Sequence, residues 1–160
     1  MPADIFIGIG SNLGDRSTNL LRGVEMLRSG GAEVTSISGL YETEPRECMP
    51  QPNFINAVIR LSWDKSSTDC LQFLLDAEAS AGRVRHFQAE PRVLDMDLLF
   101  YGSLIIKTGK LVLPHPRLHL RRFVLVPFCE IAPNFRHPIF GKTIAELLDG
   151  CTDTGRIKRV

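Results

Sequence analysis

The chain has 160 residues, 44% of them hydrophobic, and a formal net charge of +1 at pH 7, which fits one globular domain over residues 1–160 with a sizeable core. The near balance of charge argues against nucleic-acid binding, which usually needs a strongly basic surface. No segment approaches the ~20 apolar residues needed to span a membrane, so we expect no membrane partner. No signal-peptide layout is present and the cysteines are scattered along the sequence. We therefore expect a cytoplasmic protein with reduced thiols.

The first half of the sequence alternates apolar stretches with one amphipathic segment. Apolar runs bounded by turn residues indicate strands, and apolar residues three or four positions apart indicate a helix. The predicted elements are a strand over 4–9, a helix that ends at Gly30 and Gly31, a strand over 34–41 and a strand over 54–61. The helix is expected to bury one face, made of Leu20, Leu21, Val24 and Leu27.

The second half adds a helix and a strand that complete a known pattern. Ser66 can cap a helix that ends at Gly82 and carries on one stripe Leu71, Leu74, Leu75 and Glu78. Then come a strand over 91–100, a short strand over 111–113, an apolar stretch over 123–128, a short helix over 143–148 and a C-terminal tail over 149–160. The order strand, helix, strand, strand, helix, strand predicts a ferredoxin-like α+β fold, a single domain in which helices pack on one face of an antiparallel sheet.

Two carboxylates interrupt the apolar strand over 91–100. Side chains alternate along a strand, so Asp95 and Asp97 should project from one face. The other face should carry Leu94, Met96, Leu98 and Phe100. Neighbouring like charges repel unless a positive charge lies between them, and Mg²⁺ is commonly held by one or two carboxylates together with substrate phosphates. The pair therefore indicates a Mg²⁺ site; the alternative is a polar strand face exposed to water.

Four arginines lie on either side of the acidic pair in the sequence: Arg83, Arg85, Arg92 and Arg121. The guanidinium group matches the geometry of phosphate oxygens. Paired carboxylates with several arginines suit phosphoryl transfer, in which metal ions hold the phosphates and arginines stabilise the transition state. Each arginine taken alone could equally be a surface charge or the partner of a glutamate. No P-loop accompanies them, so a nucleotide would have to bind by other means.

Two further polar features have structural explanations. Glu78 lies on the apolar stripe of its helix, where it either reaches solvent or pairs with an arginine such as Arg83 or Arg92, and we expect a structural role. His115 and His119 are four residues apart and could bind zinc, but no third ligand is nearby in the sequence. A phosphate contact by His115 requires its loop to fold over the aspartates.

Several short motifs occur in the order found in one enzyme family. They are Gly10-Ser11-Asn12-Leu13-Gly14, Tyr41-Glu42-Thr43-Glu44-Pro45, Phe54-Ile55-Asn56-Ala57, Gly82-Arg83-Val84-Arg85, Pro91-Arg92-Val93-Leu94-Asp95-Met96-Asp97, Pro114-His115-Pro116-Arg117 and Arg121-Arg122-Phe123-Val124-Leu125. The chain resembles the 6-hydroxymethyl-7,8-dihydropterin pyrophosphokinases of folate biosynthesis over about residues 5–148. The acidic motif and the His-Pro-Arg motif are specific in combination, although neither is specific alone.

The resemblance implies a monomeric ferredoxin-like enzyme that moves the pyrophosphoryl group of ATP onto the pterin hydroxymethyl group and releases AMP. Asp95 and Asp97 would hold two Mg²⁺ ions, and Arg83 and Arg92 would stabilise the transferred group. The residues implied for ATP binding are Arg85, Leu98, Lys110, His115 and Arg121. Those implied for pterin binding are Thr43, Pro45, Phe54, Asn56 and Phe123, with the two phenylalanine rings on either side of the pterin.

One segment departs from the family pattern. The family usually has Arg-Trp-Gly before Pro91, where this chain has Gln88, Ala89 and Glu90. In the family this segment forms a lid, so the change bears on ATP affinity and closure more than on the type of reaction.

Two other interpretations remain: a pterin- or nucleotide-binding module without efficient catalysis, and a ferredoxin-like RNA-binding domain. A pure binder has little need for two metal-binding carboxylates, and the near-neutral charge opposes RNA binding.

Overall fold

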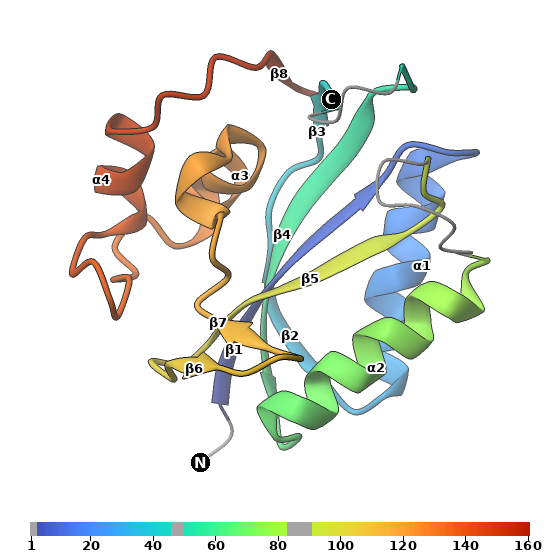
Figure 1. Cartoon of the computed structure of the whole chain (residues 1–160). Helices are drawn as coiled ribbons and strands as arrows, with labels where there is room; N and C mark the ends of the chain where they lie inside the picture. The colour runs from blue at the N-terminus through green and yellow to red at the C-terminus, as the bar shows by residue number, and fades with distance from the viewer. Residues whose placement is uncertain (1–2, 46–49, 83–90) are drawn as a thin grey trace.

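The computed structural model of the chain describes residues 3–45, 50–82 and 91–160. The chain can be followed from blue to red in Figure 1. Its elements are β1 (Ala3–Ser11), α1 (Arg16–Ser29), β2 (Glu33–Ile37), β3 (Tyr41–Thr43), β4 (Phe54–Trp63), α2 (Ser67–Ser80), β5 (Asp95–Tyr101), β6 (Ile106–Lys107), β7 (Val112–Leu113), α3 (Arg122–Ile131), α4 (Ile144–Asp149) and β8 (Ile157–Arg159). A short 3₁₀ helix, Leu118–Leu120, precedes α3.

The central feature is an antiparallel sheet. Within the described residues it has six strands in the order β5-β1-β4-β3-β8, and β2 also pairs with β4. All of the pairings are antiparallel, and β1 and β4 lie in the middle, as a ferredoxin-like arrangement requires. This confirms the predicted fold class. β6 and β7 form a separate two-stranded hairpin.

Helices cover both faces of the sheet. On one face α1 and α2 pack over an aliphatic core that includes Ile7 and Leu74. On the other face α3 and α4 pack over a core that contains Phe6, Phe100 and Phe128. Figure 1 shows the two helix layers on opposite sides of the sheet. The prediction of helices on one face only is therefore wrong, because the apolar stretch over 123–128 forms part of the helix α3, which covers the second face.

The first helix layer begins where the sequence places capping residues. Asp15 accepts a hydrogen bond from the Thr18 N–H at the start of α1, and Ser66 accepts one from the Asp69 N–H at the start of α2. Three of the four apolar residues predicted on the buried face of α1 are buried, but Leu21 is 59% exposed. It follows Leu20 by one position, and a rotation of about 100° per residue carries it off the buried stripe.

None of the helices in the described part of the chain is long and apolar enough to cross a membrane.

β5 changes phase along its length. Its first half alternates as predicted, with both carboxylates on one face, and with Met96 and Leu98 in the core under α1 and α2. Phe6 and Ile7 of β1 pair with Phe100 and Leu98, which leaves Leu99 as an extra residue in β5. Because of this bulge, Phe100 lies in the aromatic core on the same face as the carboxylates. The prediction that Phe100 shares a face with Leu98 is wrong for this reason.

Two predicted segments differ in extent. The predicted strand over 34–41 is divided into β2 and β3 near Ser38, whose hydroxyl accepts the Val58 N–H in place of a main-chain carbonyl. The segment over 149–160, predicted as a tail, contains β8, which pairs with β3 at the edge of the sheet. The polar sequence of β8 gives no alternating pattern that would indicate a strand.

Candidate active site

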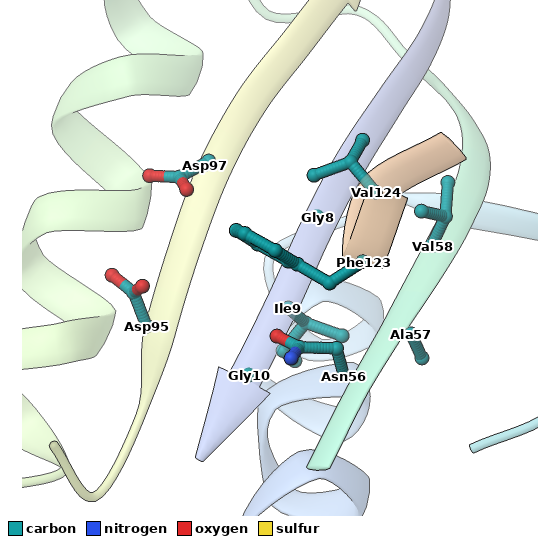
Figure 2. A pocket seen from close by; sticks show the side chains of 10 residues that line it. All are labelled: Gly8, Ile9, Gly10, Asn56, Ala57, Val58, Asp95, Asp97, Phe123 and Val124. Carbon is teal, nitrogen blue, oxygen red and sulfur yellow. The ribbon is translucent and has the colours of Figure 1, made fainter. Parts of the chain in front are cut away.

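Two glycines of β1 leave a bare strip between β4 and β5. Gly8 pairs with Asp97, and Gly10 pairs with Asn56 on one side and Asp95 on the other. A Cβ atom at Gly10 would lie 2.4 Å from Oδ1 of Asn56, so no side chain fits there without displacing that amide. We call this strip the glycine floor. Figure 2 shows the two carboxylates along one side of it and Asn56 along the other.

β5 supplies an acidic wall. Asp95 and Asp97 both line the small cavity above the glycine floor, as the alternation of the strand predicts. Nη1 of Arg92 lies 3.4 Å from Oδ2 of Asp95. Two carboxylates on one strand face are a donor set that Mg²⁺ accepts, since this ion usually keeps water ligands and shares phosphate oxygens with its carboxylates. The predicted metal-binding residues are therefore close together, and they fit the predicted ion.

Phe123, in the first turn of α3, covers the glycine floor. Figure 2 shows its ring over β1, between Asn56 and the carboxylates. The remaining cavity has a volume of about 20 Å³, which is room for about one water molecule. The guanidinium of Arg121 lies 5.6 Å from the centre of the Phe123 ring. Phe54 is buried but does not line this cavity, so the structure does not show the two rings facing each other across a slot.

The wall opposite the acidic pair is fixed by a side-chain hydrogen bond. Nδ2 of Asn56 donates to Oγ1 of Thr43 over 2.6 Å. This bond joins β4 to β3 and leaves Oδ1 of the amide facing Gly10. Pro45 follows two residues after the end of β3. Of the residues predicted to bind pterin, Thr43 and Asn56 therefore act together at one wall, while Phe123 covers the floor beside them.

Asn12 has a role that the sequence did not reveal. Its Oδ1 accepts the Arg92 N–H over 2.7 Å, and its own N–H donates to the Arg92 carbonyl over 3.0 Å. Its Nδ2 donates to Oε1 of Gln51 and to the carbonyl of Pro52. Asn12 thus fixes the main chain at Arg92 against the loop before β4. The only signal was an asparagine after a strand, which is also ordinary turn chemistry.

His115 lies close to the acidic wall. Its N–H donates to the Leu99 carbonyl of β5 over 3.0 Å, and its Nδ1 accepts the Arg117 N–H over 3.1 Å. Burial, together with the charges of Arg121 and Arg117, lowers the pKa of His115 to about 4, although the charge of Asp95 acts to raise it. The ring is therefore neutral near pH 7 and carries its proton on Nε2. It can donate that N–H to an anion without adding a charge.

The low pKa of His115 predicts a loss of stability in acid. The unfolded chain gains a proton near pH 6.5 but the folded protein only near pH 4, so stability falls as the pH drops below 6.5. Between about pH 7.5 and about pH 5 the free energy of unfolding should fall by about 2 kcal/mol. Urea unfolding of the wild type and of His115→Asn at both pH values measures this difference.

In His115→Asn the amide oxygen can replace Nδ1 as an acceptor, so the loss should be about 2 kcal/mol smaller than in the wild type. His137, whose pKa is also lowered by burial, titrates in both proteins and cancels in the comparison. Equal losses in the two proteins would show that His115 does not cause the effect.

Glu78 is a buried carboxylate behind the acidic strand. It is 3% exposed and accepts the main-chain N–H of Met96 over 2.8 Å. Met96 lies between Asp95 and Asp97, so Glu78 holds α2 to the part of β5 that carries the acidic pair. This geometry supports the predicted structural role. Leu75, predicted on the same stripe, is exposed.

The two histidines considered for zinc have different surroundings. Nδ1 of His115 accepts a main-chain N–H, whereas the ring of His119 packs edge-on against Phe140 at 4.8 Å between centroids. Phe140 in turn stacks on His137 at 4.2 Å. No group of three or more His, Cys, Asp or Glu side chains is placed to hold a metal ion among the residues that the structure describes.

Several residues implied by the family resemblance lie away from the floor. Lys110 is exposed in the turn between β6 and β7 and does not line the cavity. The side chain of Leu98 is buried in the core under α1 and α2, on the opposite face from the carboxylates, so only its main chain could contact ATP. Arg83, Arg85 and the departing segment 88–90 lie outside the described residues.

The fold and the site together define a ferredoxin-like α+β protein. Its site has a pair of carboxylates and a nearby arginine beside a floor that an aromatic ring covers. Residues 6–133 match the family described as 7,8-dihydro-6-hydroxymethylpterin-pyrophosphokinase (HPPK). The chain belongs to this family. The 2-amino-4-hydroxy-6-hydroxymethyldihydropteridine pyrophosphokinase of Methylorubrum extorquens is 38% identical over 156 residues, which cover 97% of each chain. The protein of the same name from Synechocystis sp. is 39% identical over 144 residues, covering 89% of this chain and 73% of that protein.

Longer proteins contain a similar segment. The Folic acid synthesis protein FOL1 of Dictyostelium discoideum is 36% identical over 156 residues, which are 98% of this chain but only 24% of that protein. The chain thus spans about a quarter of the length of that relative. A crystal structure of Plasmodium falciparum HPPK-DHPS with pteroate matches 94% of this chain and 42% of its own, with a TM-score of 0.70 and 12% identity. That likeness concerns the fold.

Proposed function

We propose that this chain transfers the pyrophosphoryl group of ATP to 6-hydroxymethyl-7,8-dihydropterin, giving AMP and the pterin diphosphate for folate synthesis. The hydroxymethyl oxygen loses its proton to water and forms a bond to the β-phosphorus, and the bond from that phosphorus to the oxygen that leaves with AMP breaks. One observation carries the proposal: in a member of this family, Asp95 and Asp97 line the same small cavity as Asn56 and Phe123, and Arg92 pairs with Asp95 beside it. In this proposal the chain acts as a monomer on two small-molecule substrates.

In the proposed site, Asp95 and Asp97 would hold two Mg²⁺ ions, which also bind phosphates of ATP. When bound, the ions offset the repulsion between the phosphates and the acidic wall. The donor set of the two carboxylates supports this assignment. Arg92, which is 3.4 Å from Asp95, supplies positive charge beside the transferred group as its negative charge develops.

His115 and Arg121 are proposed to bind the phosphates of ATP. The charges of Arg121 and Asp95 both act on His115, which supports a common location at the acidic edge of the floor. Neutral His115 donates its Nε2–H, and Arg121 donates charge-assisted hydrogen bonds. In this proposal His115 fixes the position of a phosphate oxygen by the direction of its hydrogen bond, whereas Arg121 attracts the phosphates mainly by its charge.

The pterin ring is proposed to lie on the glycine floor. Its polar edge would bond to Asn56 and to the main chain near Thr43 and Pro45, while Phe123 stacks on its face. Phe54, two residues before Asn56 on the same face of β4, would border the ring from the other side. A flat ligand with polar edges needs apolar faces and a few fixed donors and acceptors, and the amide held by Thr43 supplies one of them.

Release of AMP tests the proposed function. The purified protein is incubated with ATP and Mg²⁺, with and without 6-hydroxymethyl-7,8-dihydropterin, and the nucleotides are separated by chromatography. We expect AMP in an amount equal to the pterin diphosphate, and only when the pterin is present. The matched control is 6-methyl-7,8-dihydropterin, which lacks the attacking hydroxyl and should give no AMP. Formation of ADP, or of no AMP with the true substrate, would contradict the proposal.

Asn56→Ala should weaken pterin binding much more than ATP binding. The loss leaves polar atoms of the bound ring unpaired, so the KM for pterin should rise about tenfold or more while the KM for ATP changes less than about twofold. Steady-state kinetics with each substrate varied measures both constants. The matched control is Asn53→Ala, since Asn53 is exposed just before β4. Equal losses for both substrates would contradict the assignment of Asn56 to the pterin.

A further inference from the structure

The last ten residues of the chain contact both the start of α3, which covers the glycine floor, and β3, which belongs to the wall opposite the acidic pair. After α4, the segment 151–160 passes the start of α3 and then pairs with β3 as β8 (Figure 1). α3 carries Phe123, and β3 ends at Thr43, the partner of Asn56. This segment lies outside residues 6–133, which match the family.

The first contact is at the N-terminus of α3. The N-cap position is occupied by Arg121, which makes no side-chain capping bond and whose side chain has no acceptor. Oδ2 of Asp153 accepts the Arg122 N–H over 3.0 Å instead. Oδ1 of Asp153 accepts the Gly155 N–H over 2.9 Å, which fixes the carboxylate. The capped residue directly precedes Phe123, so Asp153 determines where the turn that carries this ring begins.

The second contact is at β3. β8 pairs with all three residues of that strand. Next to β8, the Arg156 N–H donates to Oε1 of Glu44 over 2.6 Å. Thr43 accepts the amide of Asn56, so the position of β3 also sets the position of that amide. Only three residues separate Asp153 from β8, and this short connection limits how far the start of α3 and β3 can move apart.

Glu130 makes a further connection near the other end of α3. Its Oε1 accepts the Tyr41 hydroxyl over 2.5 Å, and its Oε2 accepts the Gly39 N–H over 2.6 Å. Nη1 of Arg159 in β8 lies 3.5 Å from Oε1. Burial acts to raise the pKa of Glu130, but these three partners together lower it. α3 is thus held to the β3 edge of the sheet near both of its ends.

The segment 151–160 buries little apolar surface. Its residues are exposed or half-buried, and Val160 is 68% exposed. Burial of apolar surface therefore contributes little to its attachment. Its contacts with α3 and β3 are directional hydrogen bonds, which fix position. The contacts indicate that the segment serves the geometry of the site more than the stability of the core.

We propose that the segment 151–160 is a strap that sets the separation of Phe123 from Asn56, with Asp153 as its positioning residue. This inference rests on the proposed function, because it takes the glycine floor as the pterin site. Release of the start of α3 would let Phe123 move relative to the amide. Binding of the flat ring would then weaken, whereas the acidic wall on β5 would stay in place.

Asp153→Ala tests the strap. The Kd and KM for pterin should both rise about tenfold, which corresponds to about 1.4 kcal/mol, while the KM for ATP stays within about twofold. The Kd is measured by calorimetry with a non-hydrolysable ATP analogue present. Asp153→Asn keeps an oxygen acceptor and should restore most of the affinity. The matched control is Thr143→Ala, which removes the N-cap of α4 and should lower the thermal midpoint without changing the pterin Kd.

Arg156→Pro tests the second contact independently, because it removes the N–H that binds Glu44. It should show the same selective loss of pterin affinity, and it decides the matter if Asp153→Ala does not fold. Wild-type pterin affinity in a folded variant, or equal losses for ATP and pterin, would overturn the strap while AMP release by the wild type still stood. Selective loss of pterin binding in a protein that releases no AMP would instead overturn the proposed function alone.

Discussion

Asp97→Ala is expected to lower turnover at saturating substrate by about a thousandfold. The substitution leaves Asp95 as the single carboxylate of the acidic wall, so the two proposed Mg²⁺ ions would keep only one of the two carboxylates that hold them. It also removes the repulsion between two like charges on β5, and the thermal midpoint should therefore stay unchanged or rise. AMP release and thermal unfolding of the same preparation measure the two effects.

The matched control for this substitution is Asp64→Ala. Asp64 is exposed just after β4, so its loss makes the same change in net charge away from the floor and should leave turnover unchanged. In the wild type, activity should disappear in excess chelator and return with added Mg²⁺. Wild-type turnover by Asp97→Ala, or by the wild type in chelator, would rule out the metal assignment.

Arg92→Ala should lower turnover by about a hundredfold or more while changing the KM of either substrate less than about threefold. This pattern is expected of a group whose interaction strengthens as charge develops on the transferred phosphoryl oxygens. The main chain at Arg92 is held on both sides by Asn12, so the guanidinium starts from a fixed position. Steady-state kinetics with both substrates varied separates the two constants.

The matched control is Arg60→Ala. Nε and Nη2 of Arg60 donate to the two carboxylate oxygens of Asp4 in another part of the sheet. Its loss should affect stability but leave turnover unchanged. Arg92→Lys keeps the charge but loses the two-pronged geometry, and it should recover only part of the activity. A large rise in KM with normal turnover would place Arg92 among groups that only bind substrate.

The acidic wall could be predicted from sequence because alternation is a local property of an extended chain. Side chains in a strand point to the same face every second residue, so Asp95 and Asp97 share a face, whereas Asn56 and its neighbour Ile55 point to opposite faces. The capping residue Ser66 was likewise recognisable from the sequence, because its side chain accepts an N–H only three residues ahead. Features that depend on neighbours in sequence were thus predicted well.

Features that depend on distant partners were not predictable in the same way. The bulge at Leu99 is a feature of the pairing between β5 and β1. The sequence of β5 alone therefore does not indicate that Phe100 changes face. α3 contains an unbroken apolar run over 123–128 that includes Pro127, and such a run does not distinguish a helix from a buried strand. Asp153 and Asn12 act on main-chain groups far along the chain. Their roles follow from the fold and from no local pattern.

The position of Phe123 has a consequence for the rate at which a planar ligand can associate. With about 20 Å³ left above β1, a bicyclic ring cannot enter until the Phe123 side chain rotates away from the floor, while the turn that carries it stays in place. Only encounters with molecules in which this has happened are productive, so the association rate constant lies below the collision rate. The measured affinity is then the intrinsic affinity multiplied by the fraction of molecules with Phe123 displaced.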